Sequence, residues 1–153
     1  MDDPLGRRFV GLQAALFVVV GFGPWLPLAV DAAAPPQARW VGQALMLAGL
    51  LLALVAGLRL GRNLTPFPRP RPGGALVTAG VYAFARHPIY GGALLLAIGW
   101  SVAQSSVATL AATALLWLLF EAKSRYEERA LTEAYPEYPA YAAATRRFVP
   151  FVY

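Results

Sequence analysis

The segment from Arg86 to Gly92 holds the single histidine of the chain, His87, between an arginine and a proline. It begins a stretch that carries no Asp, Glu, Lys or Arg until Glu121. Ionisable groups at the edge of so apolar a stretch are costly to keep there, which marks them as functional candidates. Pro88 suits the first position of a helix. Because the free N–H groups of a helix start bind carboxylate or phosphate, we predict that this segment holds an anionic group.

Two more clusters could take part in the same chemistry. Glu127 and Glu128 follow the apolar stretch, and Tyr135, Tyr138 and Tyr141 come next. A carboxylate of the pair would accept hydrogen bonds from ribose hydroxyls or from an amino group, because an ionised carboxylate only accepts. The tyrosine rings would stack on a purine or cover a cation. The three clusters together predict a site for a nucleotide-sized, partly cationic ligand.

Each cluster also has a simpler interpretation, which the sequence leaves open. Arg86 could reach lipid headgroups, with His87 capping a helix. The acidic pair could lie on a solvated helix face, with Glu127 paired to Lys123 one turn earlier. The tyrosines could be ordinary interfacial residues. Gly91 and Gly92 could admit a ligand or only a neighbouring helix.

The elements that must position these residues are membrane helices. Apolar residues make up 58% of the chain and charged residues 14%, against roughly 45–50% and about 25% in soluble domains. Residues 9–30 and 41–58 carry no Asp, Glu, Lys or Arg. Asp31 and Arg39 lie in the turn between the two runs. A bilayer span needs about 20 such residues, and the first run is too long for a signal peptide. Pro24 is expected to kink or end the first helix.

A second helical hairpin is predicted over residues 88–120, with a turn at 104–106. Each arm covers about 22 Å at the rise of an α-helix. That is less than the roughly 30 Å of the hydrocarbon core, so full spanning stays open. We expect the second arm to continue past Glu121 towards Leu131, and a last amphipathic helix over residues 138–147.

The segment before this hairpin has a different character. Four prolines alternate with other residues between Pro66 and Pro72, which excludes a regular helix and favours an extended path. Residues 75–82 are predicted to form a short extended piece that lies against a ligand.

Charge and composition set the topology. With four spans, twelve of the 13 basic residues lie on one side and Arg39 alone on the other. The positive-inside rule makes the crowded side, with both termini and the predicted site, cytoplasmic, most simply at a bacterial inner membrane. The net charge of +5 is assigned to headgroup contact and not to nucleic acid. One histidine and no cysteine argue against a metal site.

These pieces occur together in one known family. The segment from Leu76 to Gly91 resembles the cofactor segment of the isoprenylcysteine carboxyl methyltransferases. The spacing Glu127-Glu128-x-x-Leu131, Tyr138-x-x-Tyr141 and Arg147-Phe148-Val149-Pro150 resembles the C-terminal signature of that family. The likeness covers about residues 62–151, and it implies an integral membrane enzyme that uses S-adenosylmethionine.

The resemblance also implies roles for individual residues. The cofactor contacts carry over by position to Leu76, Val77, Tyr82, His87, Pro88, Ile89, Tyr90 and Glu127, and we add Arg86 and Tyr138. The family has an arginine near the substrate carboxylate where this chain has Lys123, which lacks the bidentate fork. Lys123 or the nearby Arg125 would position the acceptor. Glu128 is the candidate proton acceptor if the methylated group is an amine.

We therefore predict an all-α membrane helix bundle with four main transmembrane helices and a cytoplasmic helical tail. Residues 1–60 would form an N-terminal helix hairpin and residues 61–153 the cofactor-binding core. The predicted reaction is methyl transfer from S-adenosylmethionine to a lipophilic or prenylated acceptor in the membrane, most simply a carboxylate. Methylation of an aminolipid, binding of anionic lipid without catalysis, and a nicotinamide-dependent reductase are the alternatives. No metal and no nucleic acid are expected as partners.

Overall fold

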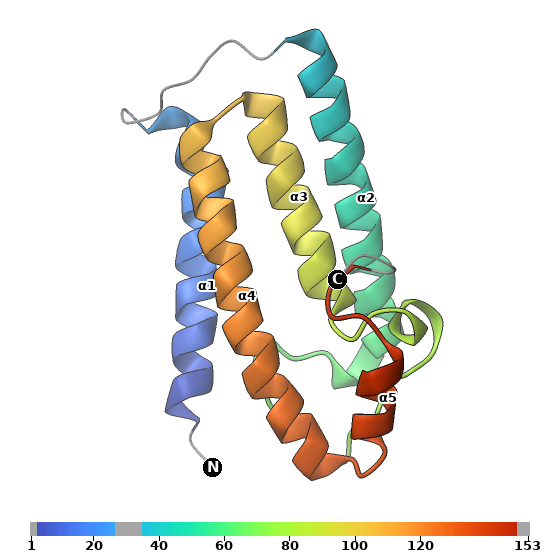
Figure 1. Ribbon diagram of the computed structural model, residues 1–153. Helices are drawn as coiled ribbons and strands as arrows, with labels where there is room; N and C mark the ends of the chain where they lie inside the picture. The colour runs from blue at the N-terminus through green and yellow to red at the C-terminus, as the bar shows by residue number, and fades with distance from the viewer. Residues whose placement is uncertain (1–2, 27–34, 150–153) are drawn as a thin grey trace.

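Four long helices lie side by side in the computed structural model, which describes residues 3–26 and 35–149 (Figure 1). Within these ranges the backbone forms helices, turns and one isolated bridge between Ala85 and Arg146. The elements are α1 (Pro4–Phe22), η1 (Gly23–Trp25), α2 (Pro36–Leu60), η2 (Gly61–Asn63), η3 (Gly80–Ala83), α3 (Pro88–Gln104), α4 (Val107–Ala134) and α5 (Tyr138–Ala144).

Local sequence explains where the first helix begins and ends. Asp3 caps α1 by accepting a hydrogen bond at Oδ1 from the Gly6 N–H, at 2.8 Å. At the other end α1 stops at Phe22 and gives way to the 3₁₀ turn η1, in which Pro24 has no N–H to continue the helix. The predicted end at this proline is confirmed. Residues 27–30 of the predicted span and 31–34 of the turn predicted over 31–39 lie outside the described residues, and α2 already begins at Pro36 within that turn.

Two pairs of glycines bring α2 and α3 into close antiparallel contact. A Cβ added to Gly42 would lie 2.5 Å from the Gly99 carbonyl oxygen, and one added to Gly99 would lie 2.6 Å from the Gly42 oxygen. Gly49 and Gly92 repeat the arrangement seven residues along each helix, at 2.5 Å and 2.6 Å. Small residues allow membrane helices to pack backbone to backbone. Gly92 therefore serves helix packing, whereas a Cβ added to Gly91 would collide with the Phe148 carbonyl, so Gly91 makes room for the tail.

The other contacts combine apolar packing with hydroxyl groups. Ser101 on α3 and Thr113 on α4 lie 3.3 Å apart at their hydroxyl oxygens, and each donates to a carbonyl one turn earlier on its own helix. Such short side chains satisfy their hydrogen bonds without a charge in the apolar part of a bundle. The buried core joins α1, α3, α4 and the tail through Val20, Leu94, Ala97, Ala112, Leu116, Phe120 and Phe148.

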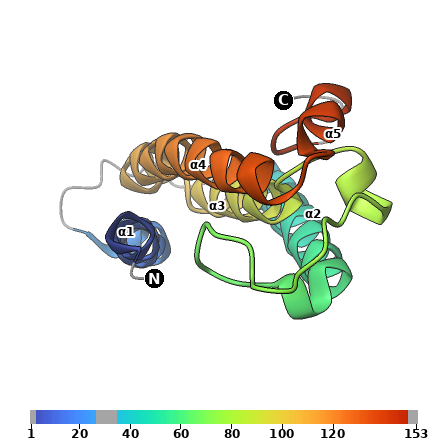
Figure 2. The same cartoon turned by 90° about the horizontal axis from the view of Figure 1, so that it is seen from below.

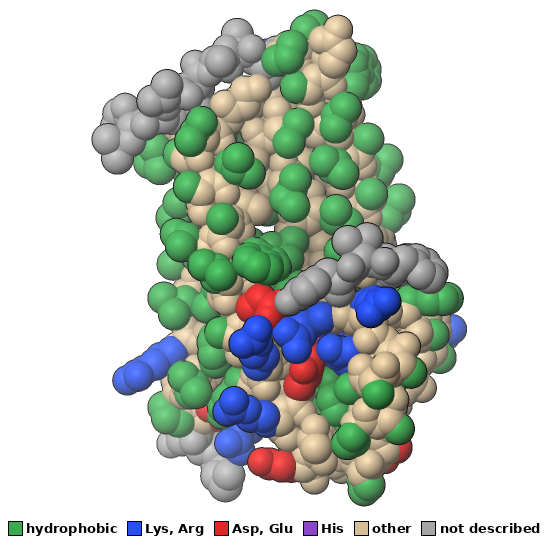
Figure 3. Space-filling view, viewed as in Figure 1, with side chains coloured by type: hydrophobic (Ala, Val, Ile, Leu, Met, Phe, Trp, Pro, Cys, Tyr) green, Lys and Arg blue, Asp and Glu red, His purple; other side chains and the backbone are tan. Residues whose placement is uncertain are grey.

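Three of the helices are long and apolar enough to cross a membrane, namely α1 with η1, α2 with η2, and α4. The shorter α3 has 17 residues, so the predicted number of four spans stays a prediction. The surface is divided accordingly: charged side chains gather in the lower part of the view, over α5 and the lower ends of α4 and α1, and the upper part shows apolar and neutral groups (Figure 3). Outward-facing apolar side chains include Leu12, Phe17, Val18, Leu47, Leu51, Leu54, Leu58, Leu110, Leu115 and Leu118.

The segments around the hairpin agree with the sequence in part. The turn at 104–106 is confirmed, with Ser105 in the left-handed region at φ 49°. The second arm continues past Glu121, as predicted, and ends at Ala134. Residues 64–79 contain no helix, which the prolines predicted. Figure 2 shows this loop passing between the ends of α1 and α2.

Two local predictions are wrong in part. In the extended piece predicted over residues 75–82, residues 75–79 contain no helix, but residues 80–83 form the 3₁₀ turn η3. The last helix ends at Ala144 instead of continuing to Arg147. The reason lies in the backbone, because Arg146 N donates to the Phe84 oxygen at 3.0 Å and Arg86 N donates to the Arg146 oxygen at 2.8 Å. This pairing with the segment before α3 replaces another helical turn.

Candidate active site

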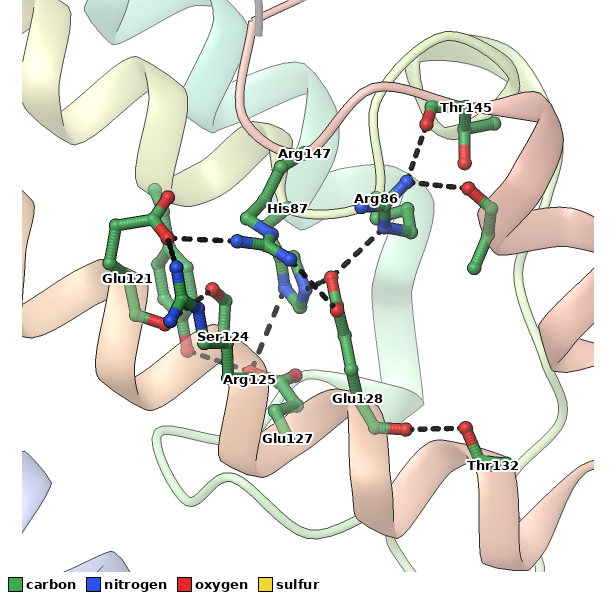
Figure 4. Close-up of polar contacts among 12 residues, drawn as sticks. Arg86, His87, Glu121, Ser124, Arg125, Glu127, Glu128, Thr132, Thr145 and Arg147 are labelled. Carbon is green, nitrogen blue, oxygen red and sulfur yellow. Dashed lines mark hydrogen bonds and ion pairs between the residues drawn. The ribbon is translucent and has the colours of Figure 1, made fainter.

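Glu128 on α4 is the centre of a charged network that joins three parts of the chain (Figure 4). Its Oε1 accepts from Arg86 Nε at 2.9 Å and lies 3.2 Å from His87 Nε2, and its Oε2 accepts from Arg147 at 3.4 Å. Arg147 also donates to Glu121 at 2.8 Å. The network fixes the tail beside the start of α3 and the polar end of α4.

This network decides two of the open interpretations. The Arg86 side chain is only 12% exposed, and it donates to the Ala142 oxygen at 2.7 Å and to the Thr145 oxygen. It does not extend towards lipid headgroups. His87 occupies the N-cap position of α3, but its side chain makes no capping hydrogen bond. Both side chains turn inwards to hold the site together.

Glu127 faces a different environment from its neighbour. Its Oε2 accepts a hydrogen bond from the Tyr90 hydroxyl at 2.9 Å and lies 3.8 Å from His87 Nδ1. The imidazole is thus placed between the two carboxylates, with Glu128 on its other nitrogen. The His87 and Tyr90 rings are stacked, with centroids 5.4 Å apart. The acidic pair is therefore not a simple solvated face.

Lys123 is buried, with 1% of its surface exposed, so a surface pair with Glu127 is not what the structure shows. Its ammonium donates to Gln13 Oε1 at 2.6 Å and to the Pro66 oxygen at 3.0 Å. The nitrogen also lies 5.3 Å from the centre of the Tyr90 ring, within range of a cation–π contact. Lys123 thereby connects α4 to α1 and to the loop over residues 64–79, called the proline-rich loop below.

A cavity of about 400 Å³ lies between these groups, within the range of small-molecule sites. It is lined by residues from α1, α2, the proline-rich loop, η3, α3, α4 and α5. All the predicted site residues line it except Pro88, Arg125 and Glu128. The lining consists of Gln13, Leu60, Asn63, Leu64, Thr65, Pro66, Arg69, Pro70, Arg71, Ala75, Leu76, Val77, Tyr82, Arg86, His87, Ile89, Tyr90, Lys123, Glu127, Leu131, Tyr135, Tyr138 and Tyr141.

The three remaining predicted residues lie behind or beside the cavity. Pro88 is buried at the first turn of α3. Glu128 holds Arg86 and His87 from outside the lining. The Arg125 side chain is 64% exposed, pairs with Glu121 at 3.1 Å and lines a separate surface groove with Glu128. The structure therefore brings Lys123, and not Arg125, to the cavity.

Tyrosines form one wall of the cavity. The Tyr141 hydroxyl donates to the Tyr82 oxygen at 2.7 Å, which connects α5 to η3. Tyr138 is 2% exposed, and its hydroxyl meets no hydrogen-bond partner among the described residues. Burial raises the pKa of Tyr141 to about 12, and it raises the pKa of Tyr138 further, with the Glu128 charge adding to the effect. These hydroxyls therefore remain neutral donors at ordinary pH.

Gln13 and Asn63 are two of the lining residues that the sequence did not predict. Asn63 donates from its amide nitrogen to the Ala75 oxygen at 3.1 Å and accepts from the Ala75 N–H at 3.4 Å, which fixes the backbone just before Leu76 and Val77. Gln13 reaches the cavity from α1 and accepts from Lys123. The sequence signal for Gln13 was a lone amide within the apolar residues 9–22. Asn63 had no such signal.

Comparison with known proteins adds the family context. A family model described as phospholipid methyltransferase matches residues 37–138. The cobalt-zinc-cadmium resistance protein CzcN of Cupriavidus metallidurans is 36% identical over 72% of this chain and 51% of its own length. A probable protein-S-isoprenylcysteine O-methyltransferase of Oryza sativa subsp. indica is 32% identical over 74% and 61%. The chain thus spans about half to three fifths of these relatives.

Two further matches extend over almost the whole chain. The nickel-cobalt-cadmium resistance protein NccN of Alcaligenes xylosoxydans xylosoxydans is 32% identical over 98% of this chain and 68% of its own. The solved structure of the eukaryotic intramembrane Ras methyltransferase, an isoprenylcysteine carboxyl methyltransferase, superposes with a TM-score of 0.70. It is 23% identical and covers 99% of this chain and 55% of its own, which shows a shared fold.

Proposed function

Since the chain belongs to the phospholipid methyltransferase family, we propose that it transfers a methyl group from S-adenosylmethionine to a lipophilic acceptor in the membrane. The proposal is supported chiefly by one observation: the Glu127 carboxylate, the tyrosine wall and the Lys123 ammonium all line the same cavity. Its lining combines charged side chains near the start of α3 and on α4 with apolar side chains such as Leu60 and Leu64. A water-soluble donor and a membrane-borne acceptor could meet there.

The residues at one end of the cavity fit S-adenosylmethionine. Leu76 and Val77 supply apolar contacts, and the tyrosines supply rings that can stack on a purine. The buried Tyr138 hydroxyl lacks a partner in the described part of the chain, so a ligand group can satisfy it. The first residues of α3 line the cavity at the positive end of that helix, which favours a carboxylate.

The carboxylate of Glu127 completes this end. It already accepts from Tyr90, and it retains capacity to accept from hydroxyl or amino groups of a ligand. We assign it, with His87 and Tyr90, to binding the donor. Arg86 and Glu128 keep His87 in place from behind.

S-adenosylmethionine supplies an electrophilic methyl group on a sulfonium that is already a good leaving group. The task of this chain is then to align the two reactants and to keep water out. The tyrosine wall and the proline-rich loop would exclude water. Lys123 would hold the reacting group of the acceptor next to the donor end of the cavity.

A carboxylate acceptor suits this arrangement better than an amine. A carboxylate is ionised at neutral pH and needs no general base, and the buried ammonium of Lys123 attracts it. An amine would need a proton acceptor, for which Glu128 was the predicted candidate. Glu128 already accepts from Arg86 and Arg147 and lies outside the cavity lining. We therefore place an S-isoprenylcysteine or another lipid acid ahead of an aminolipid.

The proposal also covers the path by which the acceptor reaches the cavity and the orientation of the protein in the membrane. Gln13 from α1, Leu60 from the end of α2 and Leu64 just after η2 line the cavity, so an apolar acceptor chain could arrive from the lipid between these helices. By the positive-inside rule the charged end lies in the cytoplasm, and we propose a bacterial inner membrane.

The proposal is tested by incubating the purified protein in detergent with methyl-labelled S-adenosylmethionine and a lipid extract of the host. Label in an alkali-labile methyl ester supports the proposed reaction. Label in a methylated amine points to the aminolipid alternative. No transfer to any lipid fraction, with no binding of the donor, would refute methyl transfer. The names of two relatives describe metal resistance, but no group of metal-ligating side chains is found in the described ranges.

A further inference from the structure

Lys123 presents a buried positive charge at the cavity wall. Among the described residues its ammonium contacts the neutral oxygens of Gln13 and Pro66, and no carboxylate lies within ion-pair distance. The nearby Glu127 is engaged by Tyr90 and faces His87. A charge removed from water without a counter-ion is costly unless a ligand supplies one. The structure therefore favours an anionic group at this position.

Gln13 determines how this positive charge is presented. The ammonium can only donate, so the Gln13 amide must turn its oxygen towards Lys123. The amide NH₂ then points away from the ammonium with two donors of its own. Lysine has three N–H bonds, of which Gln13 and Pro66 take two and leave one. Both side chains line the cavity, and each keeps a donor for a ligand.

We infer that Gln13 and Lys123 together bind the acceptor's carboxylate at two points, with Gln13 selecting a planar free acid over its neutral ester. Two donors from neighbouring side chains would reproduce what one arginine fork offers a carboxylate. The inference rests on the proposed function, because it takes the acceptor's reacting group to lie at the Lys123 end of the cavity.

The position of Gln13 supports a role beyond helix packing. It comes from α1, which lies on the opposite side of the bundle from α5 (Figures 1 and 2). Between Phe9 and Phe22 it is the single amide in an otherwise apolar or glycine sequence. Polar side chains inside such helices usually face an interior or a ligand path. The acceptor would therefore be recognised by α1, outside the elements that bind the donor.

The test compares equilibrium binding of radiolabelled N-acetyl-S-farnesylcysteine and of its methyl ester to the immobilised protein in detergent. The wild type should bind the free acid at least tenfold more tightly than the ester. Gln13→Ala should reduce that preference about tenfold, the usual effect of one hydrogen bond to a charged group. Gln13→Glu should abolish it, because a carboxylate would then pair with Lys123. Gln43→Ala is the matched control, since Gln43 is an exposed amide on α2.

A rescue variant separates recognition from simple structural support. If two donors are what the site requires, Lys123→Arg in the Gln13→Ala background should restore the acid preference to within about threefold of the wild type. Each variant should still bind S-adenosylmethionine, which reports that it is folded. An unchanged preference in Gln13→Ala, or a failed rescue in a variant that binds the donor, would overturn the inference.

The same experiment distinguishes the two proposals. Donor binding without any preference of the wild type for the acid refutes the carboxylate site and leaves methyl transfer standing. An acid preference without donor binding refutes methyl transfer and leaves the carboxylate site. If the wild type binds neither the acid probe nor its ester nor S-adenosylmethionine, both proposals are refuted.

Discussion

The two ends of the bundle are stabilised by different kinds of contact. At the apolar end and along its length, α2 and α3 touch through reciprocal glycines, and α3 and α4 share a hydroxyl pair at Ser101 and Thr113. At the polar end, Glu128 joins Arg86, His87 and Arg147. The first arrangement needs small residues and close backbones, whereas the second needs long charged side chains that meet from distant segments.

This difference separates stability from function. Glycine contacts set the distance between helices but place no chemical group. The charged network also determines where His87 and the tail lie, and through them the cavity wall. Substitutions at the apolar end should therefore change stability alone, and those at the polar end should change ligand binding as well.

Glu128→Ala should have the largest effect, because it removes the shared partner of Arg86, His87 and Arg147. Breaking a fully buried ion pair costs about 3–5 kcal/mol, and because this network is partly exposed we expect a loss of about 2 kcal/mol. Thermal unfolding in detergent should move to a clearly lower temperature, and binding of S-adenosylmethionine should weaken at least tenfold. Glu133→Ala, an exposed carboxylate on the same helix, should change neither. Equal effects of the two substitutions would remove Glu128 from the centre of the site.

Gly92→Ala should destabilise the bundle by about 1–3 kcal/mol through overpacking. The new Cβ would lie 2.6 Å from the Gly49 oxygen and 2.8 Å from the Ala53 nitrogen, both of which are backbone atoms. Gly57→Ala on α2 meets nothing within 4 Å and should be neutral or slightly stabilising. The measurement is the unfolding temperature, together with donor affinity of the folded protein. A large change in that affinity for Gly92→Ala would contradict the separation of the two ends.

Asn63→Ala should have a moderate effect confined to the donor. Losing two hydrogen bonds to the Ala75 backbone releases the segment that carries Leu76 and Val77. Donor affinity should fall about fivefold, equivalent to about 1 kcal/mol, with little change in unfolding temperature. Asn63→Asp keeps one of the two bonds and should be intermediate. Unchanged affinity in Asn63→Ala would show that the loop is held by other contacts.

Arg125→Ala should have the smallest effect. The side chain is exposed, and its pair with Glu121 resembles surface ion pairs worth under about 1 kcal/mol. Binding of the acid probe should be unchanged, in contrast to Lys123→Ala, which should lose the preference for the acid. Similar losses in the two variants would show that Arg125 also positions the acceptor, as the sequence had left open.

The membrane helices and about half of the cavity lining could be predicted from the sequence. Long uncharged runs predicted the membrane helices, and Pro24 predicted the end of the first one. The spacing around His87 and Glu127 indicated the resemblance to the methyltransferase family. The number of spans could not be fixed, because α3 is shorter than a bilayer is thick. Gln13 and Asn63 escaped prediction since their partners, Lys123 and the Ala75 backbone, are set by the folded arrangement and not by any local pattern.

In our proposal the cavity holds a methyl donor through His87 and Glu127. Isothermal titration calorimetry with S-adenosylmethionine in detergent tests it most directly, on the wild type, His87→Ala, Glu127→Ala and the exposed control Glu133→Ala. We expect the wild type and the control to bind equally, and each site variant to bind at least tenfold more weakly. Binding that is the same in all four proteins, or absent from the wild type, would contradict the assignment of this site.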